Sequence, residues 1–136
     1  MRLARFLVTV TFTAAALNAA DATSIARGKY LVDEVAKCGQ CHTPLGADGK
    51  PDASKYLKGG PLFFQQTEAV KLAGWHASAP DITSTSSLWT RWGDNSVKFF
   101  ETGLTPRGSA AGPPMPQYKM THEDAQAVLD YLKSIK

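Results

Sequence analysis

The residues of this chain with the most evident chemistry stand together at 38–42, where the sequence reads Cys38-Gly39-Gln40-Cys41-His42. Two thiols three residues apart lie on one helical turn, so each can add to one vinyl group of a porphyrin. The histidine that follows directly can bind the porphyrin iron through its imidazole. The chain has only these two cysteines. The pattern therefore predicts one covalently attached haem and leaves no thiol for a disulfide.

A Cys-x-x-Cys pair also occurs in zinc sites and in thioredoxin-like redox proteins. A zinc site of this type takes a second pair of ligands at similar spacing, and the sequence has no such pair. The thioredoxin motif lies beside a βαβ unit, and no βαβ pattern surrounds residues 38–42. The sequence therefore favours the haem interpretation.

The N-terminus has the pattern of a secretory signal peptide. Arg2 and Arg5 form a positive region, an apolar stretch runs from Phe6 to Leu17, and Ala20-Asp21-Ala22 matches an A-x-A cleavage site. A retained membrane anchor is the alternative, but a helix that spans a bilayer needs about 20 apolar residues. We therefore expect a signal peptide at 1–22 and export to the periplasm.

Removal of the signal peptide leaves residues 23–136, a length that suits one domain with one core. Cleavage after Ala19 or Ala20 also fits the pattern. The net charge is +3 for the full chain and falls to +2 when Arg2, Arg5 and Asp21 are removed. A balance so close to neutral gives no support for nucleic-acid binding.

Residues 24–37 have apolar side chains at helical spacing, with Ser24 as the expected N-cap. Gly28 lies inside this helix, where glycine costs about 1 kcal/mol relative to alanine. A close crossing with another helix would explain it. We expect the crossing partner to be the C-terminal helix, with Tyr30 and Tyr131 beside the contact.

Two more helices are expected in the second half of the chain. Thr121 and Asp124 have the spacing of a capping box, and an apolar stripe follows them to the C-terminus. A shorter helix is expected over 95–102, between Asp94 as N-cap and Gly103 as the stop signal. The residues expected to face inward from the shorter helix are Val97 and Phe100.

Between residues 44 and 92 the chain is rich in Gly, Pro, Ser and Thr, and its hydrophobic periodicity is weak. Two apolar clusters interrupt this stretch, at 62–64 and 72–75. Such a long segment without regular structure is uncommon in a compact domain. We expect its loops to pack apolar side chains on a large flat ligand, which supplies the core that the loops lack.

Together these features resemble class I cytochrome c, and most closely the small haem domains that accept electrons from bacterial periplasmic or membrane-associated dehydrogenases. The resemblance implies an all-α fold, in which the terminal helices cross and a loop-rich middle wraps around one covalent haem c. It covers nearly all of the domain at 23–136. The stretches that carry it are Arg27–Val32, Cys38–Pro44, Ala79–Thr83, Trp92–Asp94, Pro114–Pro116, Lys119–Ala125 and Tyr131–Lys133.

In the family that the chain resembles, a methionine in a proline-rich turn before the last helix binds the iron opposite the histidine. Met115 stands in such a turn, Gly112-Pro113-Pro114-Met115-Pro116, whose three prolines stiffen the backbone. The resemblance therefore implies His42 and Met115 as the two axial ligands. An iron-binding histidine donates its other ring N–H to a carbonyl, and Pro44 and Pro61 are the candidates for that carbonyl.

Other residues can compete for the sixth position on the iron. Met120 is the other thioether, although it precedes the capping residue of the last helix, where a core residue is usual. His76 is expected to be a polar surface residue, and His122 an exposed residue of the last helix. An open position is the remaining alternative. The aromatic residues expected in the core or against the haem are Phe63, Phe64, Trp75, Trp89, Trp92, Phe99, Phe100 and Tyr131, and one tryptophan could donate to a propionate.

Protein ligands on both faces of the iron would keep substrates away from it, so the expected function is one-electron transfer and not catalysis. The resemblance implies redox partners, with a dehydrogenase as donor and a terminal oxidase or another cytochrome as acceptor. Two alternatives stay open. One is a haem enzyme or gas sensor with an open or displaceable sixth ligand. The other is a permanent electron-transfer subunit of a dehydrogenase complex.

Overall fold

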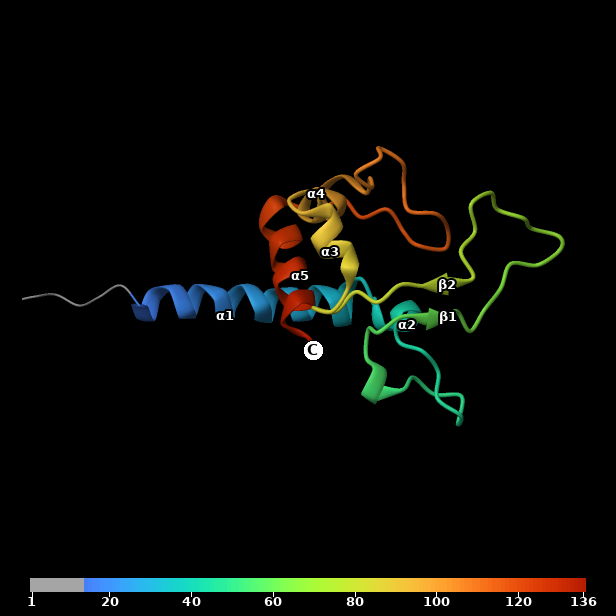
Figure 1. Ribbon diagram of the computed structural model, residues 1–136, viewed down its shortest axis with the longest axis horizontal. Coiled ribbons are helices and arrows are strands. Elements are labelled where there is room, and N and C mark those ends of the chain that lie inside the picture. The colour runs from blue at the N-terminus through green and yellow to red at the C-terminus, as the bar shows by residue number, and fades with distance from the viewer. Residues whose placement is uncertain (1–13) are drawn as a thin grey trace, which may run out of the picture.

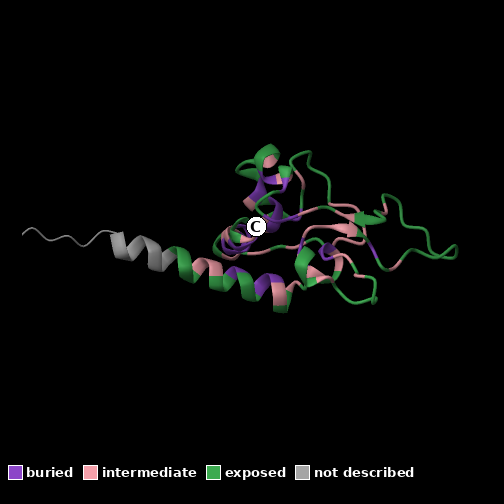
Figure 2. Cartoon of the chain, turned by 60° about the horizontal axis from the view of Figure 1, so that its bottom comes forward, coloured by how far each residue is buried: buried purple, intermediate pink, exposed green. Residues whose placement is uncertain are grey.

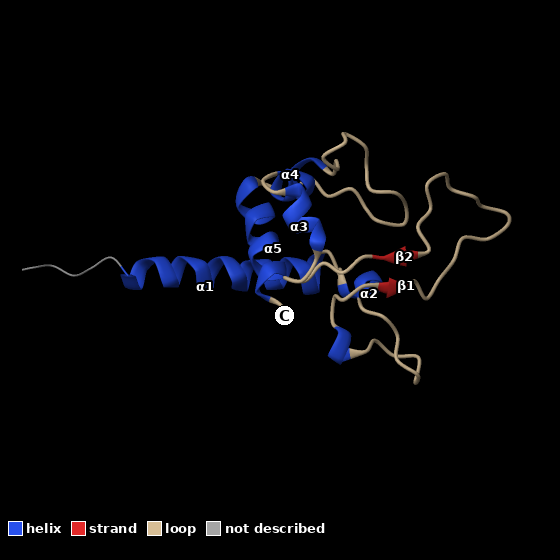
Figure 3. Cartoon of the chain, viewed as in Figure 1, coloured by secondary structure: helices blue, strands red, loops and turns tan. Residues whose placement is uncertain are grey.

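The computed structural model describes residues 14–136 as helices joined by long loops (Figure 1 and Figure 3). Arg2, Arg5 and most of the expected apolar stretch lie outside the described residues. The elements are α1 (Ala14–Tyr30), a π-helical turn (Leu31–Val35), α2 (Gly39–His42), a 3-10 turn (Ala53–Lys55), β1 (Gly60–Pro61), β2 (Ser78–Ala79), α3 (Ser87–Trp92), α4 (Asn95–Thr102) and α5 (His122–Ser134). The all-α fold class expected from the sequence is confirmed.

The terminal helices α1 and α5 cross where the sequence predicts a close contact. A Cβ atom on Gly28 would lie 1.9 Å from the backbone oxygen of Ala127 and 2.7 Å from the Cβ of Tyr131. Tyr131 is buried at this crossing, whereas Tyr30 is exposed. The Arg27 guanidinium donates to both carboxylate oxygens of Asp124, at 2.8 and 3.0 Å. The two helices therefore approach each other through backbone, with polar links beside the contact.

The first helix begins earlier than the sequence predicts. Ser24 is not an N-cap, because α1 already runs through it, and its hydroxyl instead donates to Asp130 of α5 at 2.7 Å. The alanine-rich residues before Ser24 are strong helix formers and extend the helix upstream. The helix also ends earlier, since residues 31–35 form a π-helical turn and Lys37 has a φ of 53°.

The expected helix at 95–102 has the predicted bounds and ends at Gly103, although the Asp94 side chain makes no cap bond. Phe100 is buried as expected and Val97 is partly buried. In the last helix, Thr121 caps α5 as predicted, since its hydroxyl accepts from the Asp124 N–H at 3.2 Å.

The helix α3 was not expected, because it lies in the stretch 44–92 that looks unstructured in the sequence. It is only six residues long, and its cap is Ser86, whose hydroxyl accepts from the Leu88 N–H at 3.3 Å. All five residues at 83–87 are serine or threonine, so the sequence does not single out Ser86 as the cap. α3 contributes the buried Trp89 to the core.

The short antiparallel pair β1–β2 closes the base of the loop 62–77, with Gly60 opposite Ala79 and Pro61 opposite Ser78. Figure 2 shows buried positions where α1 and the helices packed on it meet, and exposed positions along most of this loop. Leu62 is buried, but Phe63 is 62% exposed and Leu72 is 49% exposed. The expectation that both apolar clusters fold inward is therefore wrong for these two side chains.

The helix crossing makes a testable prediction. Gly28→Ala should lower the free energy of unfolding by about 3 kcal/mol, at the upper end of overpacking costs, because the added methyl has no room beside Ala127. At an ordinary helical position the same change stabilises a protein by about 1 kcal/mol. Denaturant unfolding measures the difference, with Ala26→Leu on the exposed side of α1 as a control. A stabilising Gly28→Ala would contradict the crossing.

Candidate functional site

The Cys38–His42 segment leaves the end of α1 through the π-helical turn and folds into α2. The N–H of Cys38 donates to the Val32 carbonyl at 3.0 Å, and the N–H of His42 donates to the Cys38 carbonyl at 2.9 Å. The first bond ties the motif to the π-helical turn that continues α1, and the second closes the single helical turn of α2. The two thiols and the imidazole therefore directly follow the helix that crosses α5.

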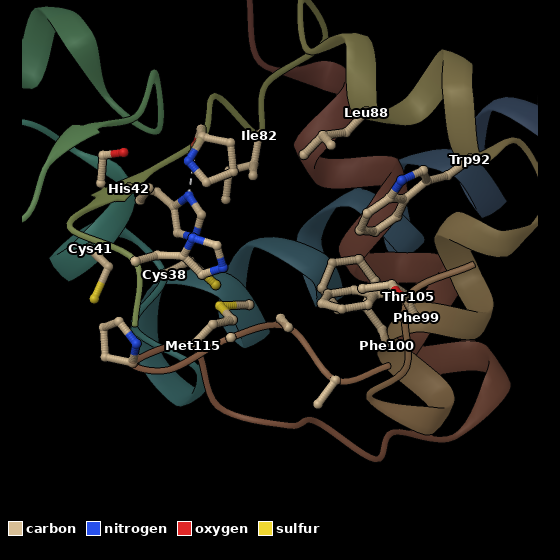
Figure 4. Close-up of a pocket in the computed structure, with 18 of the residues that line it drawn as sticks. Cys38, Cys41, His42, Ile82, Leu88, Trp92, Phe99, Phe100, Thr105 and Met115 are labelled. Carbon is tan, nitrogen blue, oxygen red and sulfur yellow. Dashed lines mark hydrogen bonds between the residues drawn. The ribbon is translucent and has the colours of Figure 1, made fainter. Parts of the chain in front are cut away.

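A cavity of about 840 Å³ lies beside this segment, which is within the range of about 300–1,000 Å³ usual for cofactor sites. Cys38, Cys41, His42 and Met115 all line it, and Figure 4 shows their side chains together at one end. Apolar side chains form much of the wall. They are Leu62, Ile82, Leu88, Trp89, Trp92, Phe99, Phe100, Ala111 and Leu132.

The two thiols are neutral in this setting. Burial raises the pKa of the Cys38 thiol to about 12, and burial also raises the pKa of Cys41. Cys38 is buried and Cys41 is partly exposed. Addition of a thiol across a carbon–carbon double bond puts the sulfur on one carbon and the proton on the other, so two thiols that face one cavity can attach one group at two points.

The imidazole of His42 is buried, with 5% exposure, and its Nδ1 lies 2.8 Å from the carbonyl oxygen of Pro80. Because that oxygen can only accept, Nδ1 carries the proton and Nε2 keeps its lone pair for a ligand. Burial lowers the pKa of His42, although the bond to Pro80 acts in the opposite direction. His42 is therefore held as a neutral imidazole, the form that binds metals.

The carbonyl partner of His42 differs from both expected candidates. The carbonyl of Pro44 accepts from the Asp52 N–H at 2.9 Å, and Pro61 is paired in β1 with Ser78 of β2. Pro80 follows β2 directly, and the β1–β2 pairing brings it to a histidine that is 38 residues away in sequence. Spacing along the chain could not reveal a contact made by that pairing.

Met115 lies in the segment 112–116, which borders the cavity. The peptide bond between Pro113 and Pro114 in this segment is cis. The carbonyl of Pro113 accepts from the His76 N–H at 2.8 Å, and the Met115 N–H donates to the Gly112 carbonyl at 3.3 Å. His76 is exposed, as expected from the sequence, and it also lines the cavity. The loop 62–77 is thus fastened to the segment that carries Met115.

The other two competitors for the iron do not line the cavity. Met120 is packed against the core, and its N–H donates to the Phe100 carbonyl at 3.0 Å. The ring of His122 is exposed and its Nδ1 lies 2.6 Å from a carboxylate oxygen of Glu101. Of the thioethers and imidazoles considered from sequence, the cavity brings together His42, His76 and Met115.

The aromatic residues divide into two groups. Trp89, Trp92, Phe99 and Phe100 line the cavity, and the indole N–H of Trp89 donates to the Thr83 carbonyl at 2.9 Å, so it has no donor left for a propionate. Phe63, Phe64 and Trp75 instead pack edge to face within the loop 62–77.

Two arginines at the cavity wall were missed in the sequence. Arg91 of α3 and Arg107 both line the cavity, and guanidinium groups are suited to binding carboxylates such as those of a haem. Neither residue has a spacing signal, because the first lies on the unexpected helix and the second in an irregular loop.

The comparisons with known proteins agree with this site. Residues 25–136 match the family model described as Cytochrome c. The chain belongs to the cytochrome c family. Members of this family carry covalent haem c and transfer electrons, and the donors around the cavity fit that group: two thiols, a neutral imidazole and a thioether.

Three curated relatives are similar to most of the chain. The chain is 35% identical over 80% of its length to the fructose dehydrogenase cytochrome subunit of Gluconobacter japonicus. It is 32% identical over 80% of its length to a diheme cytochrome c-type protein of Cereibacter sphaeroides, and 32% identical over 82% to the cytochrome c subunit of a quinone-dependent alcohol dehydrogenase of Gluconobacter oxydans. The chain spans 21%, 34% and 24% of these relatives.

None of the helices within residues 14–136 has the length and apolar character needed to cross a bilayer.

The contact between the loop 62–77 and the Met115 segment can be tested at Gly112. A Cβ there would lie 2.2 Å from the Gly74 oxygen and 2.7 Å from the His76 ring. Gly112→Ala should therefore separate the Met115 segment from the loop 62–77 and loosen its hold on Met115. Overpacking costs about 1–3 kcal/mol. A cost of that size is enough to raise about tenfold the fraction of molecules in which the Met115 segment has moved and the iron is open. Carbon monoxide binding to the reduced holoprotein reports that opening.

The matched control is Gly108→Ala, in the same loop. Gly108 has a φ of 78° but nothing within 4 Å of an added Cβ, so this change strains the backbone without a clash. Equal carbon monoxide binding by the two variants would show that the contact at Gly112 does not hold the segment in place.

Proposed function

We propose that this chain is exported to the periplasm and carries one haem c, attached through Cys38 and Cys41 and bound axially by His42 and Met115. The observation that carries the proposal is the meeting of all four side chains at one cavity. One relative is named as a diheme protein, but two cysteines supply the thioethers of a single haem. The bound group supplies a one-electron couple between ferric and ferrous iron.

The chain's own residues suit an electron carrier better than an enzyme. His42 is oriented by Pro80, and Met115 comes from the segment held by His76, so ligands would reach the iron from two separately fixed segments. With both positions filled, a substrate has no place on the metal. The apolar walls from α3 and α4 exclude water, which limits reorganisation when the charge of the iron changes.

The proposed partners are other redox proteins. Two of the relatives are named as cytochrome subunits of dehydrogenases, so we place a dehydrogenase as the electron donor and a terminal oxidase or another cytochrome as the acceptor. One observation favours a permanent subunit over a diffusing carrier. The loop 62–77, whose ends Leu62 and His76 line the cavity, exposes Phe63, Val70 and Leu72, and exposed apolar surface is typical of protein contacts.

Residues 1–22 are proposed to be the signal peptide. The part of α1 that contacts α5, from Ser24 through Gly28, would remain after cleavage behind Ala22. We predict that protein purified from the periplasm begins at Thr23, as determined by N-terminal sequencing or intact mass. A mature chain that retains Met1 would contradict the export of this protein by a cleaved signal.

The axial assignment predicts different results for the two methionines near the last helix. Met115→Leu should remove the thioether–iron charge-transfer band of the oxidised protein and let the reduced protein bind carbon monoxide, because leucine cannot ligate. Met120→Leu should keep the band, since Met120 does not line the cavity. Optical spectra of the purified proteins measure both effects.

Intact mass and the pyridine haemochrome spectrum show whether each variant carries one haem. A wild-type protein that is high-spin and binds carbon monoxide readily would instead support a haem enzyme or gas sensor. If Met120→Leu lost the band and Met115→Leu kept it, the axial ligand would be Met120 and not Met115.

A further inference from the structure

The carbonyl that accepts from His42 belongs to the peptide between Pro80 and Asp81, and this peptide is held on both sides. His42 Nδ1 lies 2.8 Å from the oxygen. On another side, a Cβ on Gly59 would lie 2.4 Å from the carbonyl carbon of Pro80 and 2.6 Å from the nitrogen of Asp81. Gly59 has a φ of 75°, which side chains rarely adopt, so backbone alone packs against the peptide there.

The same glycine is also bonded to the histidine. The Gly59 N–H donates to the backbone carbonyl of His42 at 2.7 Å. His42, Gly59 and Pro80 thus form a closed ring of contacts, in which the backbone and the imidazole of one histidine are held by two neighbouring segments. A shift of the peptide between Pro80 and Asp81 would change the geometry of the Nδ1–H bond directly.

The Asp81 side chain fixes this peptide from the downstream side. One of its carboxylate oxygens accepts from the N–H of Thr83 at 2.7 Å and from the hydroxyl of Thr83 at 2.8 Å. The other oxygen accepts from the hydroxyl of Thr85 at 2.8 Å. The ammonium group of Lys58 donates hydrogen bonds to both threonine hydroxyls, at 3.0 and 3.1 Å. The turn that begins at Asp81 is therefore locked by side chains from two segments.

We propose that Asp81, Thr85 and Lys58 are positioning residues that hold the Pro80 carbonyl on His42 and thereby lower the reduction potential of the haem. This inference rests on the proposed function, in which His42 binds the iron. A well-aligned Nδ1–H···O bond raises the basicity of the imidazole. A more basic ligand stabilises ferric iron more than ferrous iron, so loosening the carbonyl raises the potential.

Thr85→Val is the decisive variant, because it removes a hydroxyl and changes no charge. Thr85 is exposed, so the protein should fold and load haem. We expect the reduction equilibrium to shift by about threefold toward the ferrous form, the effect of losing one modest hydrogen bond. For a one-electron couple this is about 28 mV, since tenfold corresponds to 59 mV. Exchange of the His42 Nδ1–H proton, followed by NMR in the ferrous protein, should become faster.

Thr85→Ser keeps the hydroxyl and should retain the wild-type potential and exchange rate. Asp81→Asn should raise the potential further, because it weakens the turn and removes a negative charge. Its matched control is Asp52→Asn. Asp52 makes a similar turn, in which its carboxylate accepts from the N–H and hydroxyl of Ser54 at 3.0 and 2.6 Å, but it does not adjoin the acceptor of His42.

The inference is overturned if Thr85→Val leaves the potential and the proton exchange unchanged while Asp81→Asn shifts the potential, since charge alone would then explain the shift. It is also overturned if Asp52→Asn or Thr85→Ser changes both readouts as much as Thr85→Val. Intact mass distinguishes a failure of the proposed function from a failure of this inference. A wild-type chain without haem would end the proposed function and this inference with it, whereas haem-loaded variants with unchanged readouts end the inference alone.

Discussion

The contact between Gly28 and Ala127 joins the two helices from which the segments with His42 and Met115 extend. α1 continues through the π-helical turn into the Cys38–His42 segment, and α5 follows the segment that carries Met115. A side chain at the crossing would separate the helices and, with them, the ends of both segments. The backbone contact therefore brings the ends of both segments to one side of the molecule, although neither helix contributes the thiols or the thioether itself.

The cavity occupies a part of the domain that side chains would otherwise fill, and its walls are largely apolar. The helices α3 and α4 are short, and each presents aromatic side chains to the cavity. Trp89 shows how the wall is fixed, because its indole N–H is bonded to the Thr83 carbonyl and its ring faces inward. Apolar walls of this type need an apolar partner to exclude water. A flat macrocycle would fill that role for the residues between 44 and 92 that line the cavity, such as Ile82, Leu88 and Trp89.

The parts of the fold that the sequence predicts correctly depend on neighbours in the chain. The Cys38–His42 motif, the Thr121 cap and the stop at Gly103 are short-range patterns, and each lies where it was expected. The helix crossing could be predicted at Gly28 because a glycine inside a helix has few explanations other than a close contact with another helix. The errors are long-range. Pro80 reaches His42 through strand pairing, Ser24 bonds to Asp130 of α5, and Phe63 points to solvent although its apolar neighbour Leu62 is buried.

The smallest element of the fold, the β1–β2 pair, connects the two sides of the site. Gly59 precedes β1 and Pro80 follows β2, so the pairing brings together the backbone that orients His42. The loop between the strands starts with the bond from the Leu62 N–H to the Ala77 carbonyl at 2.9 Å, and His76 then reaches the Pro113 carbonyl beside Met115. Two residues per strand would be too few to hold such a loop alone. The hydrogen bonds at Pro80 and Pro113 supply the rest, so the segments that orient His42 and Met115 stabilise each other through one short sheet.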